Sequence, residues 1–127
     1  MIAVDTSALM AVILNEQPAA ACIQALERAP GLVISAATVA EALIVATSRG
    51  VSAEMQELTD QLGFEIVSVS AATAKRIGDA YRKWGKGRHP AGLNFGDCFS
   101  YDIAKTYACP LLFVGEDFRK TDLASVL

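Results

Sequence analysis

Four acidic residues, Asp5, Glu41, Asp97 and Asp117, stand where an α/β protein can bring carboxylates together. Asp5 and Asp117 each come just after a short apolar run that is typical of a buried strand. Glu41 and Asp97 lie near the beginnings of two expected helices. Because the carboxyl ends of parallel strands and the helices that follow them open onto one edge of a sheet, the four carboxylates can converge there.

A cluster of this kind suits a divalent cation. Two carboxylates about 4 Å apart repel each other by roughly 1 kcal/mol in water and by roughly 4 kcal/mol at an effective dielectric constant of 20. A bound cation replaces this repulsion with a net attraction between the ion and the carboxylates. Carboxylates without histidine or cysteine favour Mg²⁺ or Mn²⁺ over zinc. Such an ion activates water and neutralises phosphoryl charge, so the composition best fits hydrolysis of a phosphodiester.

Each acid also has a purely structural explanation. Asp5 can cap the helix that follows it, and Asp97, three residues after Asn94, can interact with a helix dipole. Glu41 can face solvent, and Asp117 can lie in a polar turn. Glu41 stands apart because residues 39–45 are otherwise all apolar. A lone buried acid in such a segment is costly unless it is paired, which favours a functional role.

Short apolar runs alternate with helical patterns along the chain. We expect strands over 2–4, 32–35, 64–69 and 111–114, and helices over 6–15, 17–28, 36–49, 53–62, 71–84 and 95–107. Ser52, Ser70 and Asn94 are the expected caps of the last three helices. Residues 85–93 form the one clear loop. This alternation predicts an α/β fold with a mainly parallel sheet covered on both faces, in a single domain over residues 1–127.

The composition excludes several other classes of protein. The chain is 53% hydrophobic, but no apolar run reaches the roughly 18 residues that span a bilayer. Asp5 stands where a signal peptide carries basic residues, so we expect a cytoplasmic protein without a membrane segment. The three cysteines are odd in number and lack C-x-x-C spacing, which predicts free, mostly buried thiols. The single histidine, His89, is expected at the surface of the loop.

The charge is distributed unevenly. The net charge is −3, yet residues 1–70 carry a net −6 and residues 71–127 a net +3. The basic excess gathers in and after the helix expected over 71–84. Two interpretations stay open: a patch that binds nucleic acid, or a solvated helix face followed by a loop.

Four segments together resemble the motifs of PIN-domain nucleases, especially the VapC-type toxins of bacterial toxin–antitoxin pairs. They are IAVDTSALM from residue 2, SAATVAEA from residue 35, HPAGLNFGDCFSYDIAK from residue 89 and PLLFVGEDFRKTD from residue 110. The third segment is the most specific. The four occur in order and span nearly the whole chain.

The resemblance implies a PIN-like three-layer α/β/α sandwich and an Mg²⁺- or Mn²⁺-dependent endoribonuclease. It further implies cleavage of structured RNA, such as tRNA or rRNA, by metal-activated water. A cognate VapB-like antitoxin and a homodimer are the implied partners. Catalytic and metal-binding roles carry over onto Asp5, Glu41, Asp97 and Asp117. Thr6 or Ser7 matches a hydroxyl position beside the first acid, and Asn94 matches a supporting or capping position.

Two residues depart from the pattern of this subgroup. Glu116 stands where a neutral residue, commonly asparagine, is frequent, and whether it is a metal ligand stays open. Asp102 stands where a small apolar residue is common. It follows Asp97 by five residues and so lies off the same helix face, which indicates a non-catalytic residue. Because neither change removes a signature acid, we expect an active enzyme.

Basic and apolar residues suggest further contacts. The candidates for contact with the RNA backbone are Lys83, Lys86, Arg88, Arg119 and Lys120. Several apolar helix residues are expected in the core, with an antitoxin groove or a dimer contact as the alternative: Ala19, Ala20, Ile23, Leu26, Leu43, Ile44 and Leu58.

Three rival functions fit parts of this sequence less well than a nuclease does. A phosphoacceptor signalling domain also gathers acids around Mg²⁺, but it needs a lysine directly after a late strand, and here Val114 is followed by Gly-Glu-Asp-Phe. A catalytically silent PIN-like module that binds RNA or protein is disfavoured by the four intact acids. A PIN nuclease of RNA maturation is distinguished from a toxin by the absence of an antitoxin-like reading frame immediately upstream.

Overall fold

A four-stranded parallel sheet forms the central layer of the computed structural model, which describes residues 1–127. The strands are β1 (Ile2–Val4), β2 (Leu32–Ser35), β3 (Glu65–Val67) and β4 (Leu111–Leu112), in the order β3-β2-β1-β4. In the register, Ala3 of β1 lies opposite Val33 of β2 and Leu111 of β4. The parallel pairing of all four strands confirms the predicted mainly parallel sheet.

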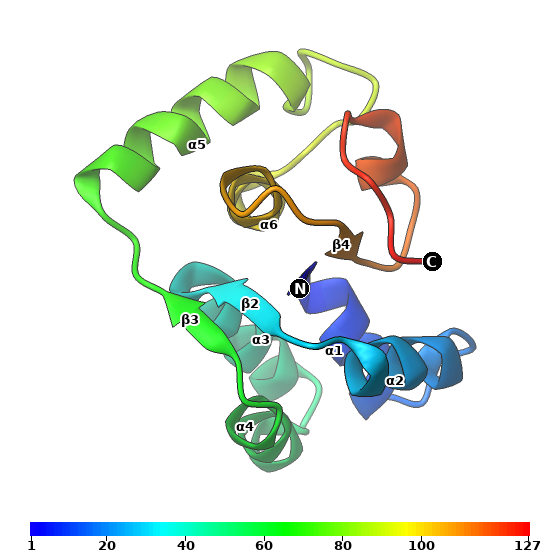
Figure 1. Ribbon diagram of the computed structural model, residues 1–127. Coiled ribbons are helices and arrows are strands. Elements are labelled where there is room, and N and C mark those ends of the chain that lie inside the picture. The colour runs from blue at the N-terminus through cyan, green and yellow to red at the C-terminus, as the bar shows by residue number, and fades with distance from the viewer.

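Helices cover both faces of this sheet (Figure 1). One face carries α1 (Thr6–Ile13), α2 (Ala19–Arg28), α3 (Ala36–Ser48) and α4 (Ser52–Gln61), and the other carries α5 (Ala71–Trp84) and α6 (Phe95–Thr106). A short 3-10 helix, η1, spans Asp117–Lys120. The alternation of β1 explains the two cores, because Ala3 packs with α5 and α6 whereas Ile2 and Val4 pack with the other helices. The three-layer α/β/α prediction is confirmed.

Several predicted element ends were wrong by a few residues. The helix expected over 6–15 ends at Ile13, and Asn15 turns the chain with a φ of 51°, a left-handed conformation that asparagine tolerates. The strand expected over 64–69 is limited to Glu65–Val67, because β2 is its only partner and pairs with these three residues. Strand β4 is likewise shorter than the expected 111–114, with two residues.

The capping predictions had mixed outcomes. Ser70 and Asn94 each cap a helix through a reciprocal capping box, as expected. Ser52 was wrongly predicted as a cap: Val51 occupies that position, and Ser52 is the first helical residue, whose hydroxyl donates to Thr47 Oγ1 at 3.1 Å.

Cysteine and histidine also have defined places in the fold. All three cysteines are free thiols, and Cys22 and Cys98 are buried, as expected. His89 is only partly exposed, because its ring packs edge-on against Trp84 with centroids 4.7 Å apart and its Nδ1 accepts a hydrogen bond from the Ala91 amide. The expected surface histidine is therefore a packed part of the loop. The helices lack the combination of length and apolar character that a membrane-spanning segment needs.

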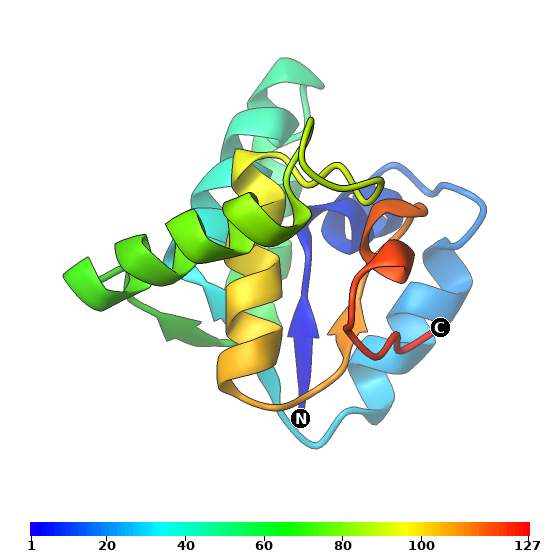
Figure 2. The same cartoon turned by 90° about the horizontal axis from the view of Figure 1, so that it is seen from above.

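The carboxyl edge of the sheet positions the predicted site. Figure 2 shows β1 and β4 pointing toward the end of the molecule at which α6 begins. Asp5 follows β1 directly and is the N-cap of α1, while Ser35 at the end of β2 caps α3. The four predicted acids thus come from elements that begin or end at this edge.

Candidate active site

Asp5 is the most firmly held of the four acids. It is 4% exposed, and its side chain caps α1. Its Oδ2 accepts hydrogen bonds from the Ser7 amide at 3.0 Å and the Ser7 hydroxyl at 2.6 Å, and its Oδ1 accepts one from Ser100 Oγ at 2.5 Å. Ser7 Oγ also accepts a hydrogen bond from the Val114 amide at 3.0 Å. Asp5 is thereby tied to the chain that leaves β4.

Glu41 projects from α3 and is fixed by a neighbour of Asp5. Thr6 Oγ1 donates a hydrogen bond to Glu41 Oε1 at 2.6 Å. Burial raises the pKa of Glu41, the Thr6 hydrogen bond opposes that shift, and the charge of Asp5 adds to it. The carboxylate is therefore neither a solvated surface group nor paired with a cation.

Asp97 lies in the first turn of α6. Its Oδ2 accepts a hydrogen bond from the Asn94 amide at 3.0 Å, and Asn94 Oδ1 accepts one from the Asp97 amide at 2.8 Å. Burial raises the pKa of Asp97 to about 6, against the effect of the Asn94 hydrogen bond. The charges of Asp5, Asp117 and Glu41 contribute to this rise. The field at Asp97 thus includes all three other predicted acids.

Asp117 and Glu116 lie together in the turn after β4 but differ in their partners. Asp117 is exposed as the first residue of η1 and makes no ion pair. Glu116 Oε2 lies 3.9 Å from Arg119 Nε, a long ion pair in which Glu116 is 80% exposed. Of these two acids, it is Asp117 whose charge raises the pKa of Asp97.

The four acids lack positively charged partners, whereas four other acids of the chain have them. Asp79, Asp102, Glu116 and Asp122 are each paired with an arginine or a lysine, whereas the four predicted acids make no salt bridge. As the side chains lie, no three Asp, Glu, His or Cys side chains are close enough to hold one ion. The donor set nevertheless fits a hard divalent cation: it consists of carboxylate oxygens that repel one another and have no counter-charge.

Sequence reasoning missed two residues of this site. Ser100 is 2% exposed and donates to Asp5 from α6. Its position three residues after Asp97, on the same helix face, was a usable signal. Gly96, next to Asp97, lies against the Glu41 carboxylate. No feature of its sequence position indicated that contact.

The basic candidates fall into two groups. Lys86 and Arg88 are exposed in the loop between α5 and α6, and Lys83 lies at the end of α5 with its ammonium 5.0 Å from the Trp84 ring centre. Lys120 and Arg119 are exposed in η1, next to Asp117. Arg119 is engaged locally, since its guanidinium donates to the Leu127 carbonyl oxygen at 3.2 Å and lies 5.4 Å from the Phe113 ring.

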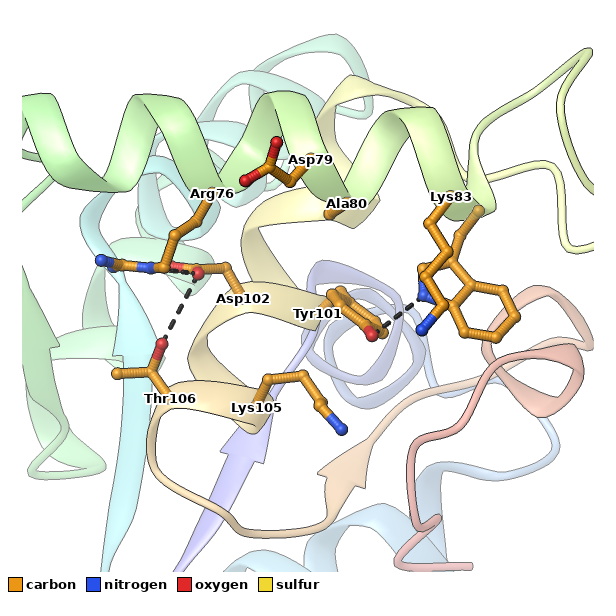
Figure 3. Close-up of a pocket in the computed structure, with 9 residues that line it drawn as sticks. Arg76, Asp79, Ala80, Lys83, Tyr101, Asp102, Lys105 and Thr106 are labelled. Atoms are coloured by element: carbon orange, nitrogen blue, oxygen red, sulfur yellow. Dashed lines mark hydrogen bonds and ion pairs between the residues drawn. The ribbon is translucent and has the colours of Figure 1, made fainter.

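A separate pocket of about 390 Å³ lies between α5 and α6, and none of the four acids lines it (Figure 3). Most of its charged groups are paired: Arg76 with Asp102 inside the lining, and Lys105 and Asp79 with Asp122 and Arg82 outside it. Asp102 is 5% exposed and binds Arg76 through both oxygens, at 2.7 and 3.2 Å. This acid joins two helices and does not face the acidic cluster.

Comparison with known proteins agrees with the four sequence motifs. The PIN domain family model matches residues 2–123. Ribonuclease VapC of Mycolicibacterium smegmatis is 44% identical over 97% of this chain and 98% of its own length. Ribonuclease VapC30 of Mycobacterium tuberculosis is 42% identical over 97% of this chain and 96% of its own length.

Solved structures share the fold at low sequence identity. VapC20 of Mycobacterium tuberculosis, described as a sarcin–ricin loop cleaving toxin, superposes with a TM-score of 0.81 at 14% identity, covering 99% of this chain and 98% of its own. A toxin–antitoxin complex from Klebsiella pneumoniae gives a TM-score of 0.72 at 19% identity, covering 96% and 93%.

Proposed function

Because the chain belongs to the PIN-domain family and, within it, to the VapC ribonucleases, we propose that it is a metal-dependent endoribonuclease and the toxin of a VapBC-type pair. The observation that carries this proposal is the set of four carboxylates at the carboxyl edge of the sheet, none of which has a basic partner. The charges of three of them raise the pKa of the fourth. A divalent cation removes that repulsion.

In this proposal Asp5, Glu41, Asp97 and Asp117 hold Mg²⁺ or Mn²⁺. The ion supplies activation of water and neutralisation of charge on the scissile phosphate. Asp5 presents a carboxylate fixed by three hydrogen bonds, and Glu41 one fixed by Thr6. Exposed Asp117, or Glu41, orients the attacking water. Hydrolysis then leaves a 5′-phosphate and a 3′-hydroxyl.

The RNA backbone is proposed to follow the exposed cations beside this edge. Lys83, Lys86 and Arg88 contribute from α5 and its loop, and Arg119 and Lys120 from η1. Specific RNA recognition usually targets loops whose bases are unstacked. We therefore propose structured RNA, such as a loop of tRNA or rRNA, as the substrate, and the cytoplasm as the place of action.

The decisive experiment is cleavage of total tRNA and rRNA by the purified protein, with Mg²⁺ or Mn²⁺ and with EDTA. Discrete, EDTA-sensitive products are expected. Asp97→Asn keeps an oxygen that can accept from the Asn94 amide, so it should stay folded while activity falls by about a thousandfold, the rate equivalent of several kcal/mol of lost charge stabilisation. Asp5→Asn should also be inactive. Activity at the parent's level in both variants would refute this metal site.

An antitoxin partner is proposed from the relatives, some of which are known in toxin–antitoxin complexes. Co-expression with the product of a small reading frame immediately upstream should yield a complex in which cleavage is suppressed. If the purified protein, freed of every partner, cuts no RNA at all, a silent binding module becomes the better interpretation. If it cuts RNA and no such reading frame exists, a role in RNA maturation is favoured.

A homodimer is proposed through the exposed apolar side chains beside α3 and α6. Ile44 is 67% exposed and Phe95 73% exposed, and both line a pocket of about 390 Å³ with Val69 and Glu41. Of the apolar helix residues considered above, Ile23, at 40% exposure, is also accessible, whereas Ala19 and Leu26 are buried. Ile44→Glu should convert a dimer into a monomer in light scattering. A dimer unaffected by this change would exclude this face.

A further inference from the structure

Gly96, the second residue of α6, leaves no room for a side chain. A Cβ atom built there would lie 2.7 Å from Cδ and 3.0 Å from Oε1 of Glu41, and nearer still to Oε2. The Glu41 carboxylate therefore lies directly on the backbone of the first turn of α6. The neighbouring Asp97 carboxylate extends from the same turn.

The backbone itself does not require glycine at this position. Gly96 is helical, and it is not among the residues with a positive φ. Alanine has the higher helix propensity, so local stability alone would favour alanine. The capping box that starts α6 uses Asn94 and Asp97 and needs nothing from residue 96. Residue 96 must lack a side chain because the Glu41 carboxylate occupies the space that a Cβ atom would fill.

We propose that Gly96 is a positioning residue for Glu41: by lacking a side chain, it lets α3 deliver this carboxylate onto the start of α6, beside Asp97. The inference rests on the proposed metal-dependent function, and it adds a residue to the site that bears no functional group. Thr6 holds the carboxylate from one side with a 2.6 Å hydrogen bond, and the Gly96 backbone borders it on the other.

The consequence of filling this space follows from which atoms are displaced. The far end of Glu41 is flexible, whereas the backbone of α6 is fixed by its capping box. Gly96→Ala should therefore displace the carboxylate, break its hydrogen bond with Thr6 and leave the helix folded. Loss of a group that only orients a metal ligand typically weakens metal affinity by about tenfold to a hundredfold, and displacing the ligand itself should cost at least as much.

The experiment uses the full chain as Gly96→Ala, Glu41→Gln and the double variant, with Gly78→Ala as the matched control. Gly78 also lies in a helix, but a Cβ there would meet only the flexible end of Arg82, at 4.0 Å. Mn²⁺ affinity is measured by calorimetry, stability by thermal unfolding, and the position of Glu41 by a crystal structure of Gly96→Ala. RNA cleavage is measured in parallel.

We expect Gly96→Ala to unfold at the parent's temperature or above it, with Glu41 turned away from Thr6 and Mn²⁺ affinity reduced by about tenfold or more. Gly78→Ala should bind Mn²⁺ like the parent. In the Glu41→Gln background, Gly96→Ala should cause little further loss, because both changes act through one carboxylate.

Three outcomes would overturn the inference. They are a Glu41 carboxylate that stays in place in Gly96→Ala, parental Mn²⁺ affinity in Gly96→Ala, or a loss of Mn²⁺ affinity on adding Gly96→Ala to Glu41→Gln that equals the loss in the parent. Failure of the proposed function is distinguishable, because there the parent itself binds no Mn²⁺ and cuts no RNA. The position of Glu41 in the Gly96→Ala crystal structure tests the steric claim in either case.

Discussion

The pKa of Asp97 depends on the charges of the other three carboxylates of the site. Asp5 is more buried, but three donors surround it, whereas Asp97 accepts a hydrogen bond from a single backbone amide. Burial and three neighbouring carboxylates then raise the pKa of Asp97 to about 6. In the proposed metal site, this residue would exchange a proton for a cation close to neutral pH.

The pH dependence follows from the direction of that shift. A carboxyl whose pKa is higher in the folded state than in the unfolded chain makes folding less favourable once it ionises. The stability gained from protonated Asp97 should be complete below about pH 4 and lost as the pH rises through about 6. Burial also raises the pKa of Glu41, which adds in the same direction.

Carboxyl NMR should show Asp97 titrating near pH 6 without divalent ions and at lower pH with saturating Mg²⁺. Stabilisation of the protein by Mg²⁺ should grow between pH 5 and pH 7.5, because protons compete for the same oxygens. Asp97→Asn should remove the titration step. A pKa near the ordinary 3.8 in the absence of Mg²⁺ would contradict the electrostatic account.

Sequence reasoning named the four acids and three of their uncharged neighbours, Thr6, Ser7 and Asn94, but it missed Ser100 and Gly96. Glu41 could be singled out because a lone acid among apolar residues is costly. The only signal for Ser100 was its position on the helix face of Asp97, and Gly96 had none, since a helical glycine is an ordinary residue. Their roles depend on how α6 lies against β1 and α3. That arrangement follows from the packing of the whole fold, which short-range patterns do not specify.

At the scale of elements, the two helices on one face of the sheet are joined by a buried charge. Asp102 of α6 is 5% exposed, and Arg76 of α5 binds it with two nitrogens. Sequence reasoning correctly placed Asp102 off the face of Asp97, but it gave no partner. The pairing spans 26 residues, and helix periodicity contains no information at that range.

Arg76→Met should destabilise the protein, because it leaves the Asp102 carboxylate buried without its counter-charge. Hydrogen bonds to charged groups contribute about 1.5–3 kcal/mol, and because Arg76 is 45% exposed, screening by solvent lowers the expected loss to about 1–2 kcal/mol. Arg82→Met is the control, since the pair of Arg82 with Asp79 is exposed on both sides and should contribute less than about 0.5 kcal/mol. Urea unfolding measures both. Equal effects would show that burial of Asp102 does not matter.

At the scale of the molecule, the four acids and the basic loop between α5 and α6 lie at the same end. The loop between α5 and α6 lies at the end of the molecule toward which β1 and β4 point (Figure 2). The loop is closed by hydrogen bonds from the Leu93 amide to the Trp84 carbonyl and from the Lys86 amide to the Leu93 carbonyl, both 3.0 Å. Lys86 and Arg88 therefore lie in a loop that is held by hydrogen bonds, at the same end of the molecule as the acids.

This arrangement predicts that the loop cations bind the RNA while the carboxylates serve its cleavage, and the salt dependence of binding tests the role of the cations. Lys86→Glu combined with Arg88→Glu should weaken RNA binding and lower the slope of log affinity against log salt by about one to two, because each phosphate contact releases close to one counterion. Lys75→Glu, an exposed cation in the first half of α5, changes the net charge in the same sense and serves as the control. Binding is measured with Asp97→Asn protein, so that the RNA stays intact.

The control determines what the result means. If only the loop variant flattens the salt dependence, the loop contacts phosphates and the basic excess of the second half of the chain has a local function. If Lys75→Glu has the same effect for each charge reversed, the attraction comes from overall charge. If neither variant changes binding, the cations form a solvated face, and the RNA must reach the carboxylates along a different surface.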